Sequence, residues 1–180
     1  MSNSVVITSA VRTAVGSLGK SLKNVSGDSL GSSVITESIN KSQIKNDEID
    51  EVIMGQVLTS GAGQNPARQA AMKSGVPKEK PAYIVNQVCG SGLRSVASGF
   101  QSIKAGDSKI VIAGGQESMS LAPHAIHLRE GKKLGNTEMT DTMIKDGLWD
   151  AFHGYHMGVT AENVATKFQV TRDDQDKFAL

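Results

Sequence analysis

The sequence predicts an α/β protein in which a largely parallel β-sheet is covered by helices. Short β-branched runs alternate with helical patterns from residue 5 to residue 115, an order typical of βαβ units. The strand candidates are continuous apolar runs, as expected for strands that are buried on both faces. Glycine is abundant, with 19 residues in 180 against 4 prolines, which favours tight turns between folded elements over a flexible linker.

The first part of the chain contains two predicted strands and one predicted helix. Residues 5–11 form a short β-branched run that predicts a buried strand, and the polar residues 12–27 predict a loop. Asp28 is the expected N-cap of a helix whose apolar residues recur at helical spacing as far as Ile39. After a charged stretch, residues 52–58 predict the second strand.

Local start and stop signals define the next helix. Asn65 is a suitable N-cap, Pro66 suits the first helical position, and Gly75 can end a helix that runs to about Lys73. Residues 82–88 then predict the third strand.

A stronger helix signal follows Gly92. Gly106 ends this helix, and residues 109–113 predict a fourth strand. The apolar residues of the helix fall at spacings typical of one amphipathic face: Leu93, Val96, Ala97, Phe100 and Ile103.

The pattern changes after residue 118. Residues 119–150 show weak periodicity, and a segment of this length usually folds as a lid or a binding element. Helices are expected near Thr160 and from Thr171, where Thr171 and Asp174 resemble a capping box. The last helix has no closing glycine or proline, which suggests a truncated piece of a longer protein.

Composition and charge argue against several classes of protein. The net charge is +1, from 19 basic and 18 acidic residues, so a nucleic-acid partner is not expected. No apolar run approaches the ~20 residues of a membrane span, and the N-terminus lacks the basic region of a signal peptide. One cysteine cannot form an internal disulfide. We therefore expect a cytoplasmic protein that does not enter a membrane.

Cys89 is the best candidate for chemistry. It lies between a predicted strand and a predicted helix, and Gly90 and Gly92 permit a sharp turn and the close approach of a substrate. Unpaired N–H groups in the first helical turn would favour a thiolate and could hold a developing oxyanion. A small cysteine packed as a hydrophobe is the competing interpretation, and the residues alone leave both open.

The four histidines occur in two pairs, His124 with His127 and His153 with His156. No cysteine or acidic signature of a zinc module accompanies them, so no metal site is predicted. Met157 follows His156, and an imidazole beside a thioether suits a pocket for a sulfur ester.

Residues 86–93, Asn-Gln-Val-Cys-Gly-Ser-Gly-Leu, followed by a helix, resemble the acylation signature of the thiolase family. The resemblance implies a layered α-β-α-β-α fold in the intact protein. This chain would hold only its N-terminal βα half, at residues 1–118, and the start of a substrate-binding loop domain, at residues 119–180. Further segments resemble the family in the same order along the chain: residues 63–70, 113–120, 143–148 and 155–165.

The resemblance also implies a reaction, closest to that of the short-chain biosynthetic branch of the family. Cys89 would take an acetyl group from acetyl-CoA and release CoA, and a second acetyl-CoA would attack the acetyl-cysteine to give acetoacetyl-CoA. The reverse reaction is thiolysis. The backbone N–H of Cys89 would contribute to an oxyanion hole. Leu148, His156 and Met157 would line the pocket for the pantetheine arm and a short acyl chain.

The resemblance implies no cofactor beyond the CoA thioester substrates, no metal, and a homotetramer built as a dimer of dimers. Family members are about twice this length, and their activating histidine, oxyanion asparagine and second cysteine lie in the C-terminal half. Two alternatives remain: a 3-ketoacyl-CoA thiolase of fatty-acid degradation with broader chain length, and a non-catalytic binding or assembly fragment. A truncated layer is also expected to expose apolar surface and to associate with another copy or fragment.

Overall fold

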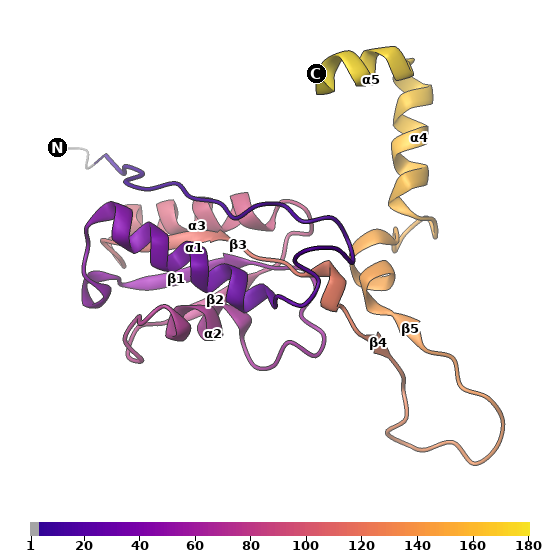
Figure 1. Cartoon of the computed structure of the whole chain (residues 1–180), viewed down its shortest axis with the longest axis horizontal. Coiled ribbons are helices and arrows are strands. Elements are labelled where there is room, and N and C mark those ends of the chain that lie inside the picture. Colours follow the sequence, from indigo (N-terminus) through magenta and orange to yellow (C-terminus); the bar gives the residue numbers. More distant parts are fainter. Residues whose placement is uncertain (1–3) are drawn as a thin grey trace. The chain divides into compact units, whose positions relative to one another are not determined.

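The computed structural model describes residues 4–180 (Figure 1). The chain divides into two compact units, Met1–His124 and Ala125–Leu180, and each is described by itself. The expected role of residues 119–180 as a substrate-binding loop domain stays a prediction. No helix in the described range is long and apolar enough to cross a membrane.

The first unit is built on a parallel three-stranded sheet in the order β2-β1-β3. Val52 in the central strand lies opposite Ala82 on one side and Ile112 on the other. The α/β class and the parallel sheet predicted from the sequence are confirmed. The strands are β1 (Glu51–Gly55), β2 (Ala82–Val85) and β3 (Val111–Gly115).

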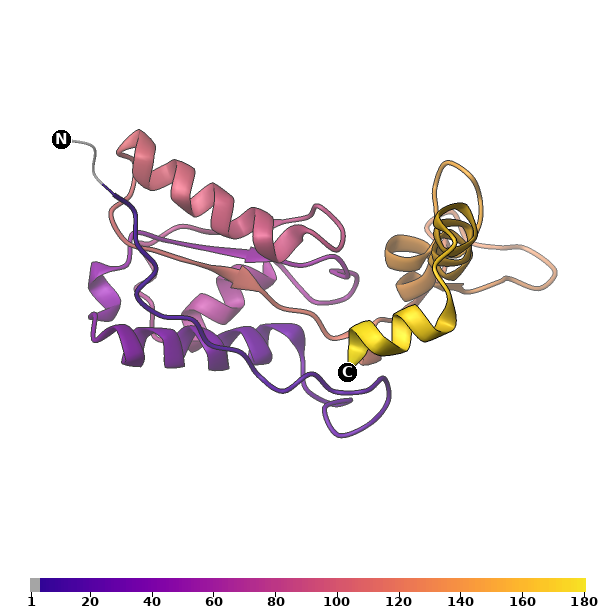
Figure 2. The same ribbon diagram turned by 90° about the horizontal axis from the view of Figure 1, so that it is seen from above.

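Helices cover both faces of this sheet. Helices α1 (Gly27–Ser42) and α2 (Pro66–Lys73) lie together on one face, and α3 (Ser91–Ala105) lies on the other (Figure 2). The hydrophobic core fills the layer between the sheet and the α1–α2 pair, where burial of each larger aliphatic side chain contributes about 1.5–3 kcal/mol. Its buried members are Ile35, Ile39, Ile49, Val52, Met54, Ala67, Ala70, Ala71 and Val76.

The prediction of a strand at residues 5–11 is wrong. This segment is extended but pairs with no strand in the described part of the chain, and Val6 and Ile7 are 69% and 78% exposed. β-branched side chains favour an extended backbone, but a strand also needs a neighbour that accepts and donates its ladder hydrogen bonds. Among residues 4–180, neither edge strand of the sheet, β2 or β3, pairs with this segment.

The prediction that Asp28 caps the first helix is also wrong. Helix α1 begins at Gly27, and Ser26 occupies the N-cap position without a side-chain cap. Asp28 lies in the first turn, is 8% exposed, and pairs with the ammonium group of Lys73 on α2. Burial acts to raise the pKa of Asp28, but the hydrogen bonds from Lys73 and Ser26 outweigh it and hold that pKa below its usual value. Asp28 therefore forms an ion pair with a separate helix instead of capping its own.

The other helix ends follow their local signals more closely. Asn65 caps α2 by accepting a hydrogen bond from the N–H of Arg68 at 3.1 Å. Gly106 ends α3 in the left-handed conformation. Helix α5 (Arg172–Ala179) begins with the predicted capping box at Thr171. Helix α3 begins at the second residue after Cys89.

The face that α3 turns to the sheet was not foreseen. Its buried residues are Ser91, Ser95 and Gly99, whereas Leu93 and Phe100 on the predicted apolar face are exposed. Spacing of i, i+4 and i+8 puts the small residues on one side of the helix. A β-carbon on Gly99 would lie only 3.0 Å from a methyl group of Val111, so small side chains are what allow α3 to lie close to β3.

The second unit contains little regular structure before its two helices. A short strand pair, β4 (His124–Ala125) with β5 (Thr140–Asp141), is followed by a π-helical turn at Ile144–Leu148. Helix α4 (Met157–Phe168) begins three residues before the expected Thr160. Large apolar side chains of this unit, such as Phe152 and Phe178, are almost fully exposed.

Candidate active site

Cys89 lies on the five-residue connection between the end of β2 at Val85 and the start of α3 at Ser91. The predicted strand–turn–helix position is therefore confirmed. The thiol is free and the residue is exposed, which excludes the interpretation of Cys89 as a buried hydrophobe. The catalytic role of Cys89 stays a prediction at this point.

The connection folds as a tight turn stabilised by backbone hydrogen bonds. The N–H of Gly90 donates to the carbonyl of Gln87 at 3.0 Å, and the N–H of Ser91 donates to the carbonyl of Val88 at 3.1 Å. The N–H of Arg94 then donates to Gly90 at 2.9 Å and continues the turn into the helix. Because residue 90 has no side chain, nothing from the N-cap position covers the first turn of α3.

Glycines at the carboxyl ends of two strands let the first turn of α3 approach the sheet. A β-carbon on Gly55, the last residue of β1, would lie 2.4 Å from the carbonyl carbon of Ser91 and 2.5 Å from the nitrogen of Gly92. A β-carbon on Gly115, the last residue of β3, would lie 3.3 Å from the α-carbon of Gly92. The sequence analysis did not identify this role of Gly55 and Gly115, although a glycine at the end of an apolar run can indicate the close approach of another backbone segment.

Ser95 fixes the same helix to the sheet through its buried hydroxyl group. That oxygen lies 2.6 Å from the carbonyl oxygens of Gly92 and Gly114. Together with the glycine contacts, these bonds place the helix that follows Cys89 at the carboxyl edge of the sheet. This edge is where parallel α/β sheets commonly bind ligands.

Polar side chains at this edge form a partly buried network that the sequence did not reveal. The carboxylate of Glu117 accepts from the N–H of Val57 at 2.8 Å, and burial raises the pKa of Glu117 despite the lowering effect of its backbone bonds. The amide of Gln116 donates to Gln56 at 2.9 Å, and Gln56 donates to the carbonyl of Leu58. The network orders the chain where it leaves β1 and β3.

The other predicted site residues belong to the second unit and come together around one short loop. Leu148 ends the π-helical turn, and the next residue, Trp149, forms an antiparallel bridge with His156. His156 is the N-cap of α4 and accepts a hydrogen bond from the N–H of Gly158 through Nδ1 at 3.0 Å. Met157 is the first residue of α4. Leu148, His156 and Met157 are therefore neighbours, whereas Cys89 is part of the first unit.

The two histidine pairs do not assemble into a metal site. Among the residues that the structure describes, no three histidine, cysteine or acidic side chains are grouped closely enough to hold an ion. His153 instead lies 3.0 Å from a carboxylate oxygen of Asp150 and stacks on the ring of Tyr155.

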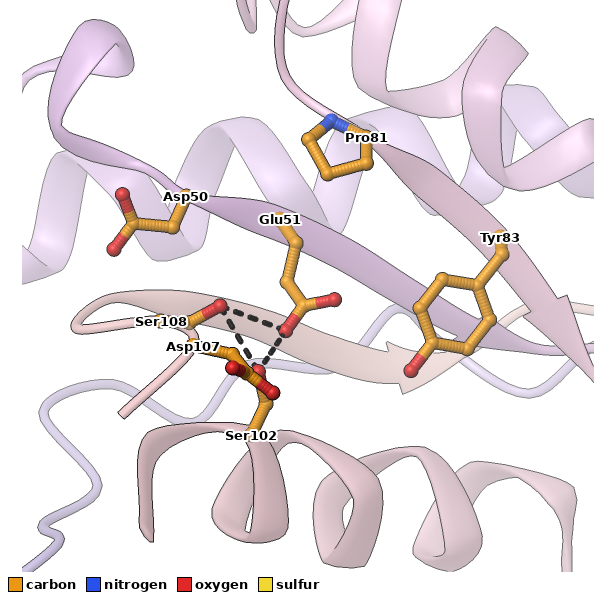
Figure 3. A pocket seen from close by; sticks show the side chains of 7 residues that line it. All are labelled: Asp50, Glu51, Pro81, Tyr83, Ser102, Asp107 and Ser108. Carbon is orange, nitrogen blue, oxygen red and sulfur yellow. Dashed lines mark hydrogen bonds between the residues drawn. The ribbon is translucent and has the colours of Figure 1, made fainter. Parts of the chain in front are cut away.

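The cavity near the start of β1 and the candidate nucleophile Cys89 suggest different positions for a functional site. A cavity of ≈ 540 Å³ lies near the start of β1 and is open to solvent (Figure 3). There the carboxylate of Glu51 accepts hydrogen bonds from the hydroxyl groups of Ser102 and Ser108. These polar groups satisfy one another, and Cys89 does not line the cavity. The chemistry therefore favours the turn at Cys89. The lining residues are Asp50, Glu51, Pro81, Tyr83, Ser102, Asp107 and Ser108.

Comparison with known proteins supplies an independent line of evidence. Residues 5–180 match the family described as the thiolase N-terminal domain. The chain is 60% identical to an acetyl-CoA acetyltransferase of Rhizobium meliloti (strain 1021) and 55% identical to one of Shinella zoogloeoides, in each case over 100% of this chain and 46% of the relative. It is 52% identical to the cytosolic acetyl-CoA acetyltransferase of Rattus norvegicus, over 99% of this chain and 45% of the relative. The chain thus spans about half the length of the curated relatives it matches.

Proposed function

The chain belongs to the thiolase family, and we propose that it is the N-terminal part of an enzyme that condenses two acetyl-CoA molecules into acetoacetyl-CoA and CoA. The family match confirms the resemblance seen in the sequence. The names of the relatives support the choice of acetyl-CoA as substrate. The observation that carries the proposal is the free, exposed Cys89 on a tight turn at the N-terminus of α3.

In the first half-reaction the first unit supplies the nucleophile, and the histidine that activates it is assigned, by family resemblance, to the C-terminal half of the relatives. The sulfur of Cys89 attacks the carbonyl carbon of acetyl-CoA, a carbon–sulfur bond forms to the cysteine, and the bond to the CoA sulfur breaks. The thiol proton of Cys89 passes to the departing CoA sulfur. By the family resemblance, the backbone N–H of Cys89 helps to stabilise the negative charge that develops on the carbonyl oxygen.

The second half-reaction forms the new carbon–carbon bond. A second acetyl-CoA loses a proton from its methyl carbon, and that carbon attacks the acetyl-cysteine. Acetoacetyl-CoA forms and the thiolate of Cys89 leaves. The proton acceptor for this step is assigned, by family resemblance, to the C-terminal half that relatives possess. Leu148, His156 and Met157 are proposed to contact the pantetheine arm and the short acyl chain, a role supported by their grouping around one loop.

The location, oligomeric state, cofactors and partners of the enzyme are also proposed. We propose a cytoplasmic location, which agrees with the single cysteine and with the rodent relatives that are named cytosolic. A homotetramer and the absence of any cofactor besides the CoA thioesters are proposed from the family resemblance alone. Neither nucleic acid nor a membrane is proposed as a partner, in line with the near-neutral charge and the absence of a long apolar run from the sequence.

Acetylation of the chain tests the proposal directly. Incubation with acetyl-CoA should add one acetyl group to the unaltered chain, detectable by intact mass spectrometry and mapped to Cys89 by peptide analysis. Cys89→Ala should remove the adduct, and hydroxylamine should reverse it because the bond is a thioester. A folded chain that gains no acetyl group would support the non-catalytic alternative.

Chain-length preference separates the proposed enzyme from a fatty-acid-degrading thiolase. In the full-length protein, kcat/KM for acetoacetyl-CoA should exceed that for longer 3-ketoacyl-CoA substrates, because each methylene that does not fit a tight pocket costs about 1–3 kcal/mol. Equal values for short and long substrates would favour the broader-chain alternative.

A further inference from the structure

We propose that Ser91 is a positioning residue for Cys89, because its hydroxyl group holds the preceding Val88 in a left-handed backbone conformation that orients the nucleophile. The inference rests on the proposed function, since it concerns the same cysteine. It assigns a task to a side chain that lies two residues beyond the thiol.

Val88 has an unusual backbone. Its φ is 49°, in the region that favours glycine and that a β-branched residue rarely adopts. The other non-glycine residues with positive φ in the described chain, Gln43, Asn65 and Gln169, all lie at helix ends. Val88 is the only β-branched member of this set, and it directly precedes the proposed nucleophile. Strained residues persist only where surrounding contacts hold them, and such residues cluster at functional sites.

The Ser91 hydroxyl supplies two of the contacts that hold Val88. Its oxygen accepts a hydrogen bond from the N–H of Gln87 at 2.9 Å and donates one to the carbonyl of Val88 at 2.6 Å. One buried group therefore clamps the backbone before and after the strained residue, and Ser91 is only 4% exposed. Asn86 adds a second clamp, since its side-chain oxygen accepts from the N–H of Val88 at 2.9 Å.

The clamp determines how Cys89 is presented. A trans peptide directs its carbonyl oxygen and its N–H to opposite sides, and the described chain contains no cis peptide. The carbonyl of Val88 points to the hydroxyl and N–H of Ser91. The N–H of Cys89 is consequently turned away from the first turn of α3, and the cysteine is carried outward on the exposed side of the turn. Without the hydroxyl, only the side chain of Asn86 and the N–H of Ser91 still hold Val88, and we expect Val88 to return to negative φ and to rotate this peptide.

Two variants of Ser91 distinguish the effect of losing the hydroxyl group from a general disturbance of the fold. Ser91→Thr keeps the hydroxyl, whereas Ser91→Ala removes it with the smallest change in shape. The direct readout is the nuclear Overhauser cross-peak between the amide and α protons of Val88. This cross-peak is strong only when φ is positive, because the two protons are then closest. We expect a strong cross-peak in the unaltered chain and in Ser91→Thr, and a weak one in Ser91→Ala. A strong cross-peak in Ser91→Ala would overturn the proposal.

Acylation provides the second readout. Ser91→Ala should slow acetylation of Cys89 by acetyl-CoA at least tenfold, with the rate restored in Ser91→Thr. Alkylation by iodoacetamide, which reports on Cys89 alone because the chain has one cysteine, should remain similar in all three proteins and show that the thiol is still accessible. An acetylation rate that Ser91→Ala leaves unchanged would also overturn the proposal.

Ser74→Ala is the matched control for loss of a buried serine hydroxyl. Ser74 is 8% exposed and its hydroxyl contacts the backbone carbonyls of Ala70 and Ser32, remote from the turn. This variant should lose thermal stability but keep the Val88 cross-peak and the acetylation rate. If the unaltered chain gains no acetyl group, the proposed function fails, while the response of the cross-peak to Ser91→Ala still decides the role of Ser91.

Discussion

At the scale of single residues, side chains that bond to the backbone control how the strands are connected. Asp50 lies immediately before β1 and accepts hydrogen bonds from the N–H groups of Lys109 at 2.7 Å and Ile110 at 3.0 Å. These bonds are the main reason why the pKa of Asp50 lies below its usual value, and Lys80 adds a smaller contribution. One carboxylate thus holds the approach to β3 beside the start of β1.

The pH dependence of stability follows from this shift. Because folding lowers the pKa of Asp50, its stabilising effect is present above the ordinary aspartate pKa and is lost as pH falls through the lower, folded value. Asp50→Asn should therefore reduce the free energy of unfolding by roughly 1 kcal/mol near neutral pH, a modest figure because water screens the partly exposed carboxylate. Urea titrations over a series of acidic pH values should show that the difference in the free energy of unfolding between Asp50→Asn and the unaltered chain becomes smaller as pH falls. A difference that stays constant would contradict this account.

At the scale of elements, the helix that follows Cys89 is positioned by missing side chains. Small residues line the face of α3 toward the sheet, and Gly55 at the end of β1 leaves the space that the backbone of Ser91 occupies. Close approach of helix and sheet brings the turn to the carboxyl edge of the strands. The same closeness makes that edge intolerant of added volume.

Gly55→Ala tests this contact. The new β-carbon would lie 2.4 Å from a backbone atom of Ser91, so α3 must shift, and we expect a loss of about 2–3 kcal/mol in the free energy of unfolding measured by urea denaturation. Gly114→Ala on β3 is the matched control, because its β-carbon would meet only ordinary contacts with Met54 at 4.0 Å. Equal stability of the two variants would show that the helix is not held by this close approach.

At the scale of the whole molecule, the chain exposes apolar groups that a folded protein normally covers. The outer face of α3 presents Leu93, Val96 and Phe100, which are 78%, 38% and 49% exposed. Contiguous apolar patches usually mark surfaces that meet another protein. The sequence predicts that the chain associates with another copy or fragment. This stays a prediction, and the outer face of α3 is the surface that we expect to take part.

Sedimentation velocity can measure that association. The unaltered chain should form dimers or larger species, and replacing both Leu93 and Phe100 with lysine should shift it toward monomer without lowering the melting temperature, since both side chains are exposed. Ile7→Lys is the matched control, because Ile7 is as exposed as Leu93 but lies outside α3. A monodisperse monomer in the unaltered chain would contradict the prediction.

The sequence by itself determined the features that depend on near neighbours. The α/β class, helix α2 with its Asn65 cap, the capping box at Thr171 and the strand–turn–helix position of Cys89 were all predicted. Caps, turns and amphipathic spacing involve residues within about four positions of one another, so the local sequence contains their cause.

Only the tertiary structure decided the features that join distant residues. Residues 5–11 lack a strand partner, Asp28 pairs with Lys73 instead of capping its helix, and Gly55 admits the first turn of α3. A strand needs a neighbour, an ion pair needs its opposite charge, and a close contact needs empty space on a separate element. The residues near each position do not predict these conditions, because each condition arises only when remote segments pack together.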